Sequence, residues 1–162
     1  MIKIFDNLVS SDFQKKIYNE LKTLNYVPEK DFPTATYSVG LSSNIDKRNF
    51  TYTFLNNILL NVPELFNKIL YRSYVNKFLP KEIPFFHKDY ETEDSYTALY
   101  YSDNQDFTLE ELGETSFYIK EIDEIKGILA IPGRIVVFNS NILHRATSFR
   151  NKDRYTVAFK FK

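Results

Sequence analysis

The feature that most limits the possible folds is the distribution of residue types from residue 71 to the end of the chain. Short runs of β-branched and aromatic residues alternate there with turn residues, as strands require. The candidate strands are Tyr71–Phe78, Phe85–Tyr90, Tyr96–Ser102, Thr115–Ile119, Gly127–Ile131, Arg134–Asn139, Leu143–Ser148 and Arg154–Phe161. Because no helical pattern lies between them, we predict an antiparallel sandwich or barrel rather than a parallel sheet.

Helical periodicity is found only before this region. Ser10 is suited to cap a first helix. The apolar residues of this helix recur at helical spacing, at Phe13, Ile17, Leu21 and Leu24. Two further short helices are expected between residues 50 and 70, with Pro63 in the first turn of the second. Thr36–Gly40 is a candidate short strand between these helical segments.

Composition and charge limit the kinds of site and partner. The chain has no cysteine, so a metal would need nitrogen and oxygen ligands. Lys and Arg equal Asp and Glu at 21 each, which gives no electrostatic case for nucleic acid or an anionic membrane. A signal-peptide pattern is absent, and no window approaches ~20 apolar residues. We expect one cytoplasmic domain over residues 1–162, with a helical support region at 1–70 and a β-core at 71–162. Since no helix follows the last strand, we expect a monomer.

Both histidines of the chain lie where they could share a metal with a carboxylate. Alternate residues of a strand point to the same face, so the side chains of His87 and Asp89 should project together. His144 follows the apolar strand 135–138 and a short polar connection, near the start of the next strand. Two histidines and one carboxylate form the triad of non-haem Fe(II) oxygenases, although zinc accepts the same ligands. A His-x-acid pair alone arises by chance in roughly a quarter of such chains, so a surface histidine beside a carboxylate is the alternative.

A possible carboxylate-binding site follows ten residues after the second histidine. Strand periodicity places Arg154 and Thr156 on one face, with Tyr155 and Val157 on the other. An arginine fork beside a hydroxyl group suits the distal carboxylate of a dicarboxylic acid. The alternative is an edge strand whose outer face faces solvent, formed by Arg154, Thr156, Ala158 and Lys160.

Taken together and in order, these segments resemble one enzyme family over about residues 74–162. The matching segments are His87-x-Asp89, Thr97–Tyr101, Leu112–Phe117, Pro132–Phe138, His144 and Arg154-x-Thr156. They are similar to the prolyl 4-hydroxylase-like branch of the Fe(II)/2-oxoglutarate-dependent dioxygenases. The chain departs from that pattern at Leu112, where the family has glycine, and at Arg154, where many proline hydroxylases have lysine.

The resemblance implies a double-stranded β-helix core (jelly-roll, cupin-like) with the N-terminal helices packed on one sheet. It implies that His87, Asp89 and His144 hold a catalytic Fe(II). The residues that it assigns to 2-oxoglutarate are Tyr101, Arg154 and Thr156. The implied reaction uses O₂, with ascorbate as a candidate reductant, and releases succinate and CO₂. The implied substrate is a peptide or small molecule, with peptidyl proline as the first guess.

Two other functions compete with hydroxylation. A jelly roll could have lost turnover and bind a ligand, or a zinc-dependent enzyme could use the same three metal ligands. The joint presence of the triad and Arg154-x-Thr156 favours catalysis, and Asp89 favours hydroxylation over halogenation. The acceptor stays open, because specificity is expected to depend on loops at Asn25–Arg48 and Asp103–Gly113.

Overall fold

The computed structural model describes residues 1–29, 39–45, 48–103 and 107–162. The elements in chain order are β1 (Ile2–Phe5), α1 (Ser11–Lys22), β2 (Val27–Pro28), β3 (Leu41–Asn44), α2 (Asn49–Asn61), η1 (Pro63–Leu65), β4 (Leu70–Phe78), β5 (Tyr96–Ser102), η2 (Leu109–Glu111), β6 (Thr115–Ile119), β7 (Glu124–Ile128), β8 (Ile135–Asn139), β9 (His144–Ala146) and β10 (Arg154–Phe161). The predicted α+β, mainly β character is thereby confirmed. Of the helices in these ranges, none is both long and apolar enough to cross a membrane.

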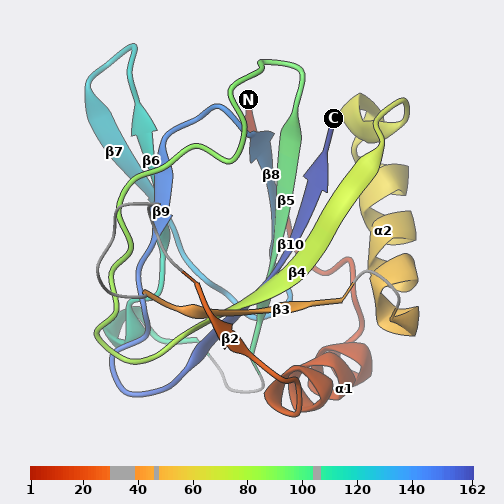
Figure 1. The fold of residues 1–162 in the computed structure, drawn as a ribbon, viewed down its shortest axis with the longest axis vertical. Helices are drawn as coiled ribbons and strands as arrows, with labels where there is room; N and C mark the ends of the chain where they lie inside the picture. The colour runs from red at the N-terminus through yellow and green to blue at the C-terminus, as the bar shows by residue number, and fades with distance from the viewer. Residues whose placement is uncertain (30–38, 46–47, 104–106) are drawn as a thin grey trace.

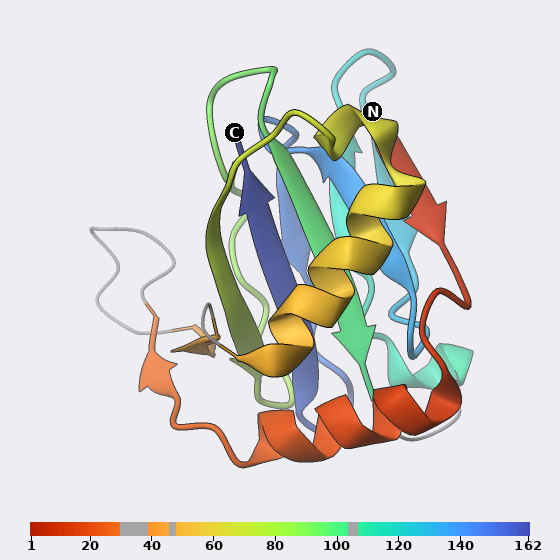
Figure 2. The same ribbon diagram turned by 90° about the vertical axis from the view of Figure 1, so that its right-hand side faces the viewer.

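The strands form two antiparallel sheets, and both helices cover the outer face of the larger one. The larger sheet has the order β1-β8-β5-β10-β4-β3-β2, and the smaller has the order β7-β6-β9. Seen along the sheets, the smaller sheet lies on one side of the larger, with α1 and α2 on the other (Figure 1). A quarter turn shows α2 crossing the strands obliquely and α1 lying across their lower ends (Figure 2). The larger sheet is therefore the middle layer, and both of its faces are covered.

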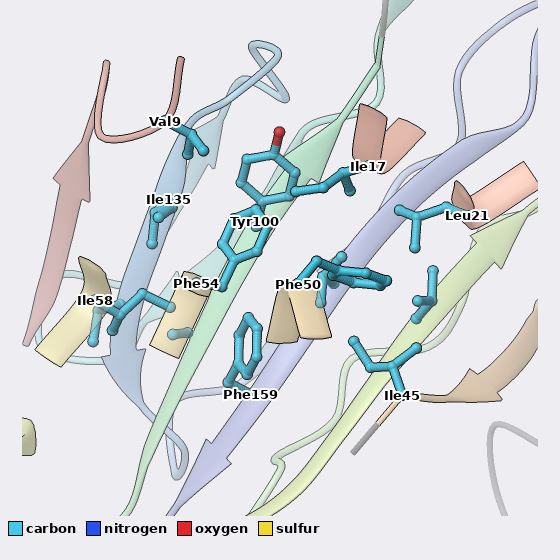
Figure 3. Close-up of a cluster of buried hydrophobic side chains, with 14 of the residues drawn as sticks. Val9, Ile17, Leu21, Ile45, Phe50, Phe54, Ile58, Tyr100, Ile135 and Phe159 are labelled. Carbon is cyan, nitrogen blue, oxygen red and sulfur yellow. The ribbon is translucent and has the colours of Figure 1, made fainter. Parts of the chain in front are cut away.

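The side-chain period of two along each strand explains two separate cores. On β8, Ile135 and Val137 face the helices, whereas Val136 and Phe138 face the smaller sheet. The helical side of the sheet packs against α1 and α2, where Phe54 lies against Tyr100 with ring centroids 4.4 Å apart (Figure 3). The other face of the sheet closes the space that contains the candidate site.

The first helix begins where the sequence predicts. The Ser10 hydroxyl accepts a hydrogen bond from the backbone N–H of Phe13 at 3.3 Å, which satisfies a donor that the helix leaves free. In a different part of the chain, the turn before β8, Gly133 has a φ of 82°, a conformation that glycine reaches without steric penalty.

Replacing the Ser10 cap should have a small and local effect on stability. We expect Ser10→Ala to lower the free energy of unfolding by about 1 kcal/mol, or the unfolding midpoint by about 3 °C, because one helical N–H loses its acceptor. Thermal unfolding followed by circular dichroism measures the change. Ser11→Ala, one residue inside the helix, is the matched control, and equal midpoints for the two variants would contradict the capping role.

Several predicted elements differ from the structure. Tyr96–Ser102, Thr115–Ile119 and Arg154–Phe161 coincide with β5, β6 and β10, and Tyr71–Phe78 and Arg134–Asn139 differ from β4 and β8 by one residue. The prediction of a strand at Phe85–Tyr90 is wrong, since only His87 makes an isolated bridge there, to His144. The strand predicted at Gly127–Ile131 lies three residues earlier, as β7, and the strand predicted at Leu143–Ser148 is shortened to β9. The second of the two short helices predicted between residues 50 and 70 is only the short helix η1. Strands β1, β2 and β3 were not predicted. Residues 36–38 of the candidate strand Thr36–Gly40 lie outside the described residues.

Candidate active site

A cavity of about 260 Å³ lies between the two sheets and contains most of the site residues predicted from sequence. Strands β4, β5 and β10 line it on one side, and β6, β9 and residues 84–89 line it on the other. Glu29 and Val39, from the loop region expected at the mouth, also line it. The cavity therefore opens beside segments that are far apart in the sequence.

The structure brings His87, Asp89 and His144 together at one end of this cavity. One ligand atom from each residue lies within 4.8 Å of the others. Nε2 of His87 is 3.7 Å from Oδ1 of Asp89, and Nε2 of His144 is 3.4 Å from Oδ2. The backbone pairing of His87 with His144 fixes the two imidazoles side by side, with ring centroids 4.6 Å apart. Such a cluster of two nitrogens and a carboxylate is suited to a divalent metal.

Backbone carbonyls orient both imidazole rings. Nδ1 of His87 lies 3.1 Å from the carbonyl oxygen of Phe85, and Nδ1 of His144 lies 2.8 Å from that of Ile142. If each Nδ1 donates to its carbonyl, each Nε2 carries the lone pair and faces the cluster. Burial lowers the pKa of His144 to about 4, which keeps that imidazole neutral at neutral pH. Neutral, oriented histidines are the form that binds metals.

Asp89 is held by groups that the sequence analysis did not assign to the site. Its Oδ2 accepts a hydrogen bond from the Thr97 hydroxyl at 2.6 Å and also contacts the ammonium group of Lys160. Burial alone would raise the pKa of the Asp89 carboxyl, but the Lys160 ammonium group, together with the His144 imidazole once acid protonates it, outweighs burial and holds this pKa below its usual value. Asp89 is therefore a carboxylate at neutral pH.

Arg154 and Thr156 lie on the cavity side of β10, as the strand period predicts. Arg154 is 1% exposed, and its Nε and Nη2 donate to the carbonyl of Gly113 at 2.8 Å and to Oγ1 of Thr115 at 3.0 Å. Among the described residues, no carboxylate forms an ion pair with this guanidinium, and burial lowers its pKa. The hydroxyl of Thr156 is buried beside it without a hydrogen-bond partner in the described chain. The Arg154 guanidinium and the Thr156 hydroxyl can therefore still donate hydrogen bonds to a molecule in the cavity.

Tyr101 lies behind the cavity rather than in its lining. Its hydroxyl donates to Oγ1 of Thr115 at 2.7 Å, and its ring centroid is 5.3 Å from the Arg154 guanidinium carbon. Thr115 therefore connects Tyr101 with Arg154 and itself lines the cavity. In this arrangement, Tyr101 supports the arginine and does not reach the cavity directly.

Lys160, Thr97 and Thr115 were not among the site residues predicted from sequence. The alternative of a solvent-facing edge strand is wrong, because β10 lies between β4 and β5 and all of its residues are buried. Lys160 had a detectable signal, since strand alternation already places it on the Arg154 face. Tyr74 and Asn76 both line the cavity.

The loop before β6 has an unusual backbone at the position where the sequence departs from the family pattern. Leu112 has a φ of 62° and Gly113 a φ of 82°. A side chain on Gly113 would meet the Phe149 ring at 2.4 Å. This close approach presents the Gly113 carbonyl to Arg154, so the loop takes part in fixing the guanidinium. Residues 104–106 of the acidic connection lie outside the described residues.

Comparisons with known proteins give structural matches only. No protein-family model and no curated protein matches the sequence. A prolyl-4-hydroxylase from Pseudomonas putida matches with a TM-score of 0.74 at 15% identity, covering 99% of this chain and 91% of that one. A Trichoplax adhaerens prolyl hydroxylase, in complex with a hypoxia inducible factor oxygen degradation domain peptide fragment, matches with a TM-score of 0.74 at 17% identity, covering 99% and 82%.

A third match has a different type of molecule bound. HygX from Streptomyces hygroscopicus, with nickel, 2-oxoglutarate and hygromycin B bound, has a TM-score of 0.74 at 14% identity, covering 99% of this chain and 82% of that one. The structural neighbours are thus prolyl hydroxylases and 2-oxoglutarate–Fe(II) oxygenases. At these identities, the likeness shows a shared fold.

Proposed function

We propose that this protein is an Fe(II)- and 2-oxoglutarate-dependent dioxygenase that hydroxylates a peptide or small-molecule substrate. One observation carries the proposal. The His87, Asp89 and His144 cluster shares a cavity with Arg154, a buried cation that has no carboxylate partner among the described residues. A metal and a dicarboxylate co-substrate together account for both features.

The donor set fits an iron ion that keeps open positions. Two imidazole nitrogens and one carboxylate would occupy one side of the metal, as in other 2-His-1-carboxylate sites. With 2-oxoglutarate and O₂, the bound iron supplies oxidative decarboxylation, in which one oxygen atom enters succinate and the other enters a substrate C–H bond. This chain's contribution is to keep His144 neutral, to orient the Nε2 atoms of both histidines and to hold Asp89 as a carboxylate.

The far end of the cavity fits the distal carboxylate of the co-substrate. A buried guanidinium without a counter-ion is unfavourable, so an anion that enters beside Arg154 removes an electrostatic penalty. The fork of Arg154 and the unpartnered Thr156 hydroxyl can both donate to that carboxylate. Tyr101 acts through Thr115 and Arg154 rather than by direct contact.

The same proposal extends to the architecture and the substrate. We infer that the two sheets form a double-stranded β-helix and that residues 1–70 support the core at 71–162 as one domain. Peptidyl proline is the first substrate candidate, since two of the matched structures are prolyl hydroxylases. A small molecule is the second, since hygromycin B is bound in another match. A zinc hydrolase would leave the buried Arg154 without a role, whereas a ligand-binding module that had lost turnover would be expected to have lost at least one of the three metal ligands.

The test is an anaerobic titration of the Fe(II)-loaded protein with 2-oxoglutarate. Chelation of Fe(II) by a 2-oxo acid gives a weak visible charge-transfer band, and we expect this band to appear and to saturate. Succinate, which has the distal carboxylate but no 2-oxo group, is the matched control ligand and should give no band. Absence of the band with fully loaded iron would contradict the proposal and favour the zinc or binding-module functions.

A further inference from the structure

Lys160 makes contacts that the proposed function does not yet explain. It is 4% exposed and is the only buried lysine in the part of the chain that the structure describes. Its ammonium group contacts Oδ2 of Asp89, lies 3.3 Å from the Thr97 hydroxyl and lies 5.6 Å from the centroid of the Tyr74 ring. These contacts place a second cation at the proposed metal centre.

The position of Lys160 in the sheet buries its side chain. Its neighbours across the ladder are Thr97 on β5 and Arg72 on β4, so the side chain leaves a central strand and enters the space between the sheets. Buried lysines are rare and unfavourable unless an opposite charge compensates them. In the described chain, Asp89 is the carboxylate that forms the ion pair with Lys160. The two residues therefore stabilise each other.

The contacts of Asp89 are concentrated on one of its two oxygens. Oδ2 receives both Thr97 and Lys160 and also lies 3.4 Å from Nε2 of His144, whereas Oδ1 faces Nε2 of His87 at 3.7 Å. Groups that donate to a carboxylate oxygen fix the plane of the carboxylate. A divalent ion that binds Asp89 must then share this carboxylate with an ammonium group already present.

We propose that Lys160 is the internal counter-ion of Asp89, which holds this carboxylate in place in the metal-free protein and competes with the metal for it. The competition with the metal rests on the proposed function, whereas the ion pair itself does not. The site would then stay assembled without metal, and its affinity for divalent ions would be lower than its ligands alone would give.

The test compares Lys160→Met with the wild type, with and without Mn(II). Methionine keeps most of the apolar stem and removes the charge. We expect the metal-free unfolding midpoint to fall by about 10 °C, because Asp89 is left buried without a partner. Mn(II) should raise the midpoint more in the variant than in the wild type. It should also bind the variant at least about 10-fold more tightly in calorimetry, since the competing charge is gone.

Lys162→Met is the matched control. Lys162 lies two residues after Lys160 but is exposed and does not line the cavity, so its loss should change neither the midpoint nor Mn(II) binding. Equal metal-free midpoints for Lys160→Met and the wild type, or equal stabilisation of both by Mn(II), would overturn the proposal.

A double-mutant comparison separates charge from packing. In an Asp89→Asn background there is no carboxylate to neutralise, so adding Lys160→Met should no longer lower the midpoint. If it lowers the midpoint as much as in the wild type, Lys160 acts by packing and the proposal is wrong. A wild-type protein that gains no stability from Mn(II) would overturn the metal centre and the competition. The metal-free comparison would still decide whether Lys160 neutralises Asp89.

Discussion

His87→Ala should reduce iron-dependent decarboxylation of 2-oxoglutarate by at least about 1,000-fold, because the metal loses one of three ligands. His87 is the ligand best suited to this test, since its side chain is 35% exposed and fills no part of either core. Removing it should leave the unfolding midpoint of the metal-free protein nearly unchanged. Release of ¹⁴CO₂ from 1-labelled 2-oxoglutarate measures the activity, and calorimetry with Mn(II) measures the loss of metal binding.

Glu91→Ala is the control for this variant. Glu91 lies four residues after His87 on the same segment, and its side chain is 80% exposed. This change should leave decarboxylation and Mn(II) binding as in the wild type. Turnover by His87→Ala within about tenfold of the wild type would remove His87 from the metal centre.

Arg154→Met should weaken binding of 2-oxoglutarate by about 2–5 kcal/mol, or from about 30-fold to a few thousandfold, because the distal carboxylate loses a buried guanidinium. The effect should depend on that carboxylate. The wild type should bind 2-oxoglutarate far more tightly than 2-oxobutyrate, which lacks the distal carboxylate, and Arg154→Met should bind the two with similar affinity. The charge-transfer titration of the iron-loaded protein measures both affinities.

The comparison of the two ligands also separates a local effect from a general loss of structure. A variant that was only unstable would lose affinity for both 2-oxo acids in parallel. Arg150→Met is the matched control, because Arg150 is an exposed arginine four residues earlier and its guanidinium lies 4.0 Å from Glu110. If Arg154→Met kept the wild-type preference for 2-oxoglutarate, the carboxylate site would have to lie elsewhere.

Local sequence patterns were sufficient to predict which side chains point to the same face of a single strand. The alternation along Arg154–Phe161 correctly separates Arg154 and Thr156 from Tyr155 and Val157, because side-chain direction in a strand follows directly from its period. The Ser10 cap is local in the same sense, since its acceptor and donor are three residues apart. These features need no knowledge of the rest of the fold.

Features that depend on which strands are neighbours could not be predicted in this way. β1 has four residues and pairs with β8, at least 130 positions later. The segment with His87 is not a strand, and its position depends on backbone bonds between His87 and His144. Strand alternation places Lys160 on the Arg154 face, but it does not say whether that face is buried, and lysines usually face solvent. The central place of β10 in the sheet is what buries it.

The place of β10 between β4 and β5 has a consequence for the length of the co-substrate. Arg154, Thr156 and Lys160 project from one strand that is hydrogen-bonded on both sides, and Arg154 and Lys160 are six residues, or about 20 Å of backbone, apart. The positions from which their side chains reach into the cavity are therefore fixed relative to each other, because β10 can neither stretch nor slide without breaking two ladders. We expect an oxo acid one carbon shorter or longer than 2-oxoglutarate to bind more weakly, because the carboxylate site at Arg154 and the metal ligand beside Lys160 cannot move to meet it.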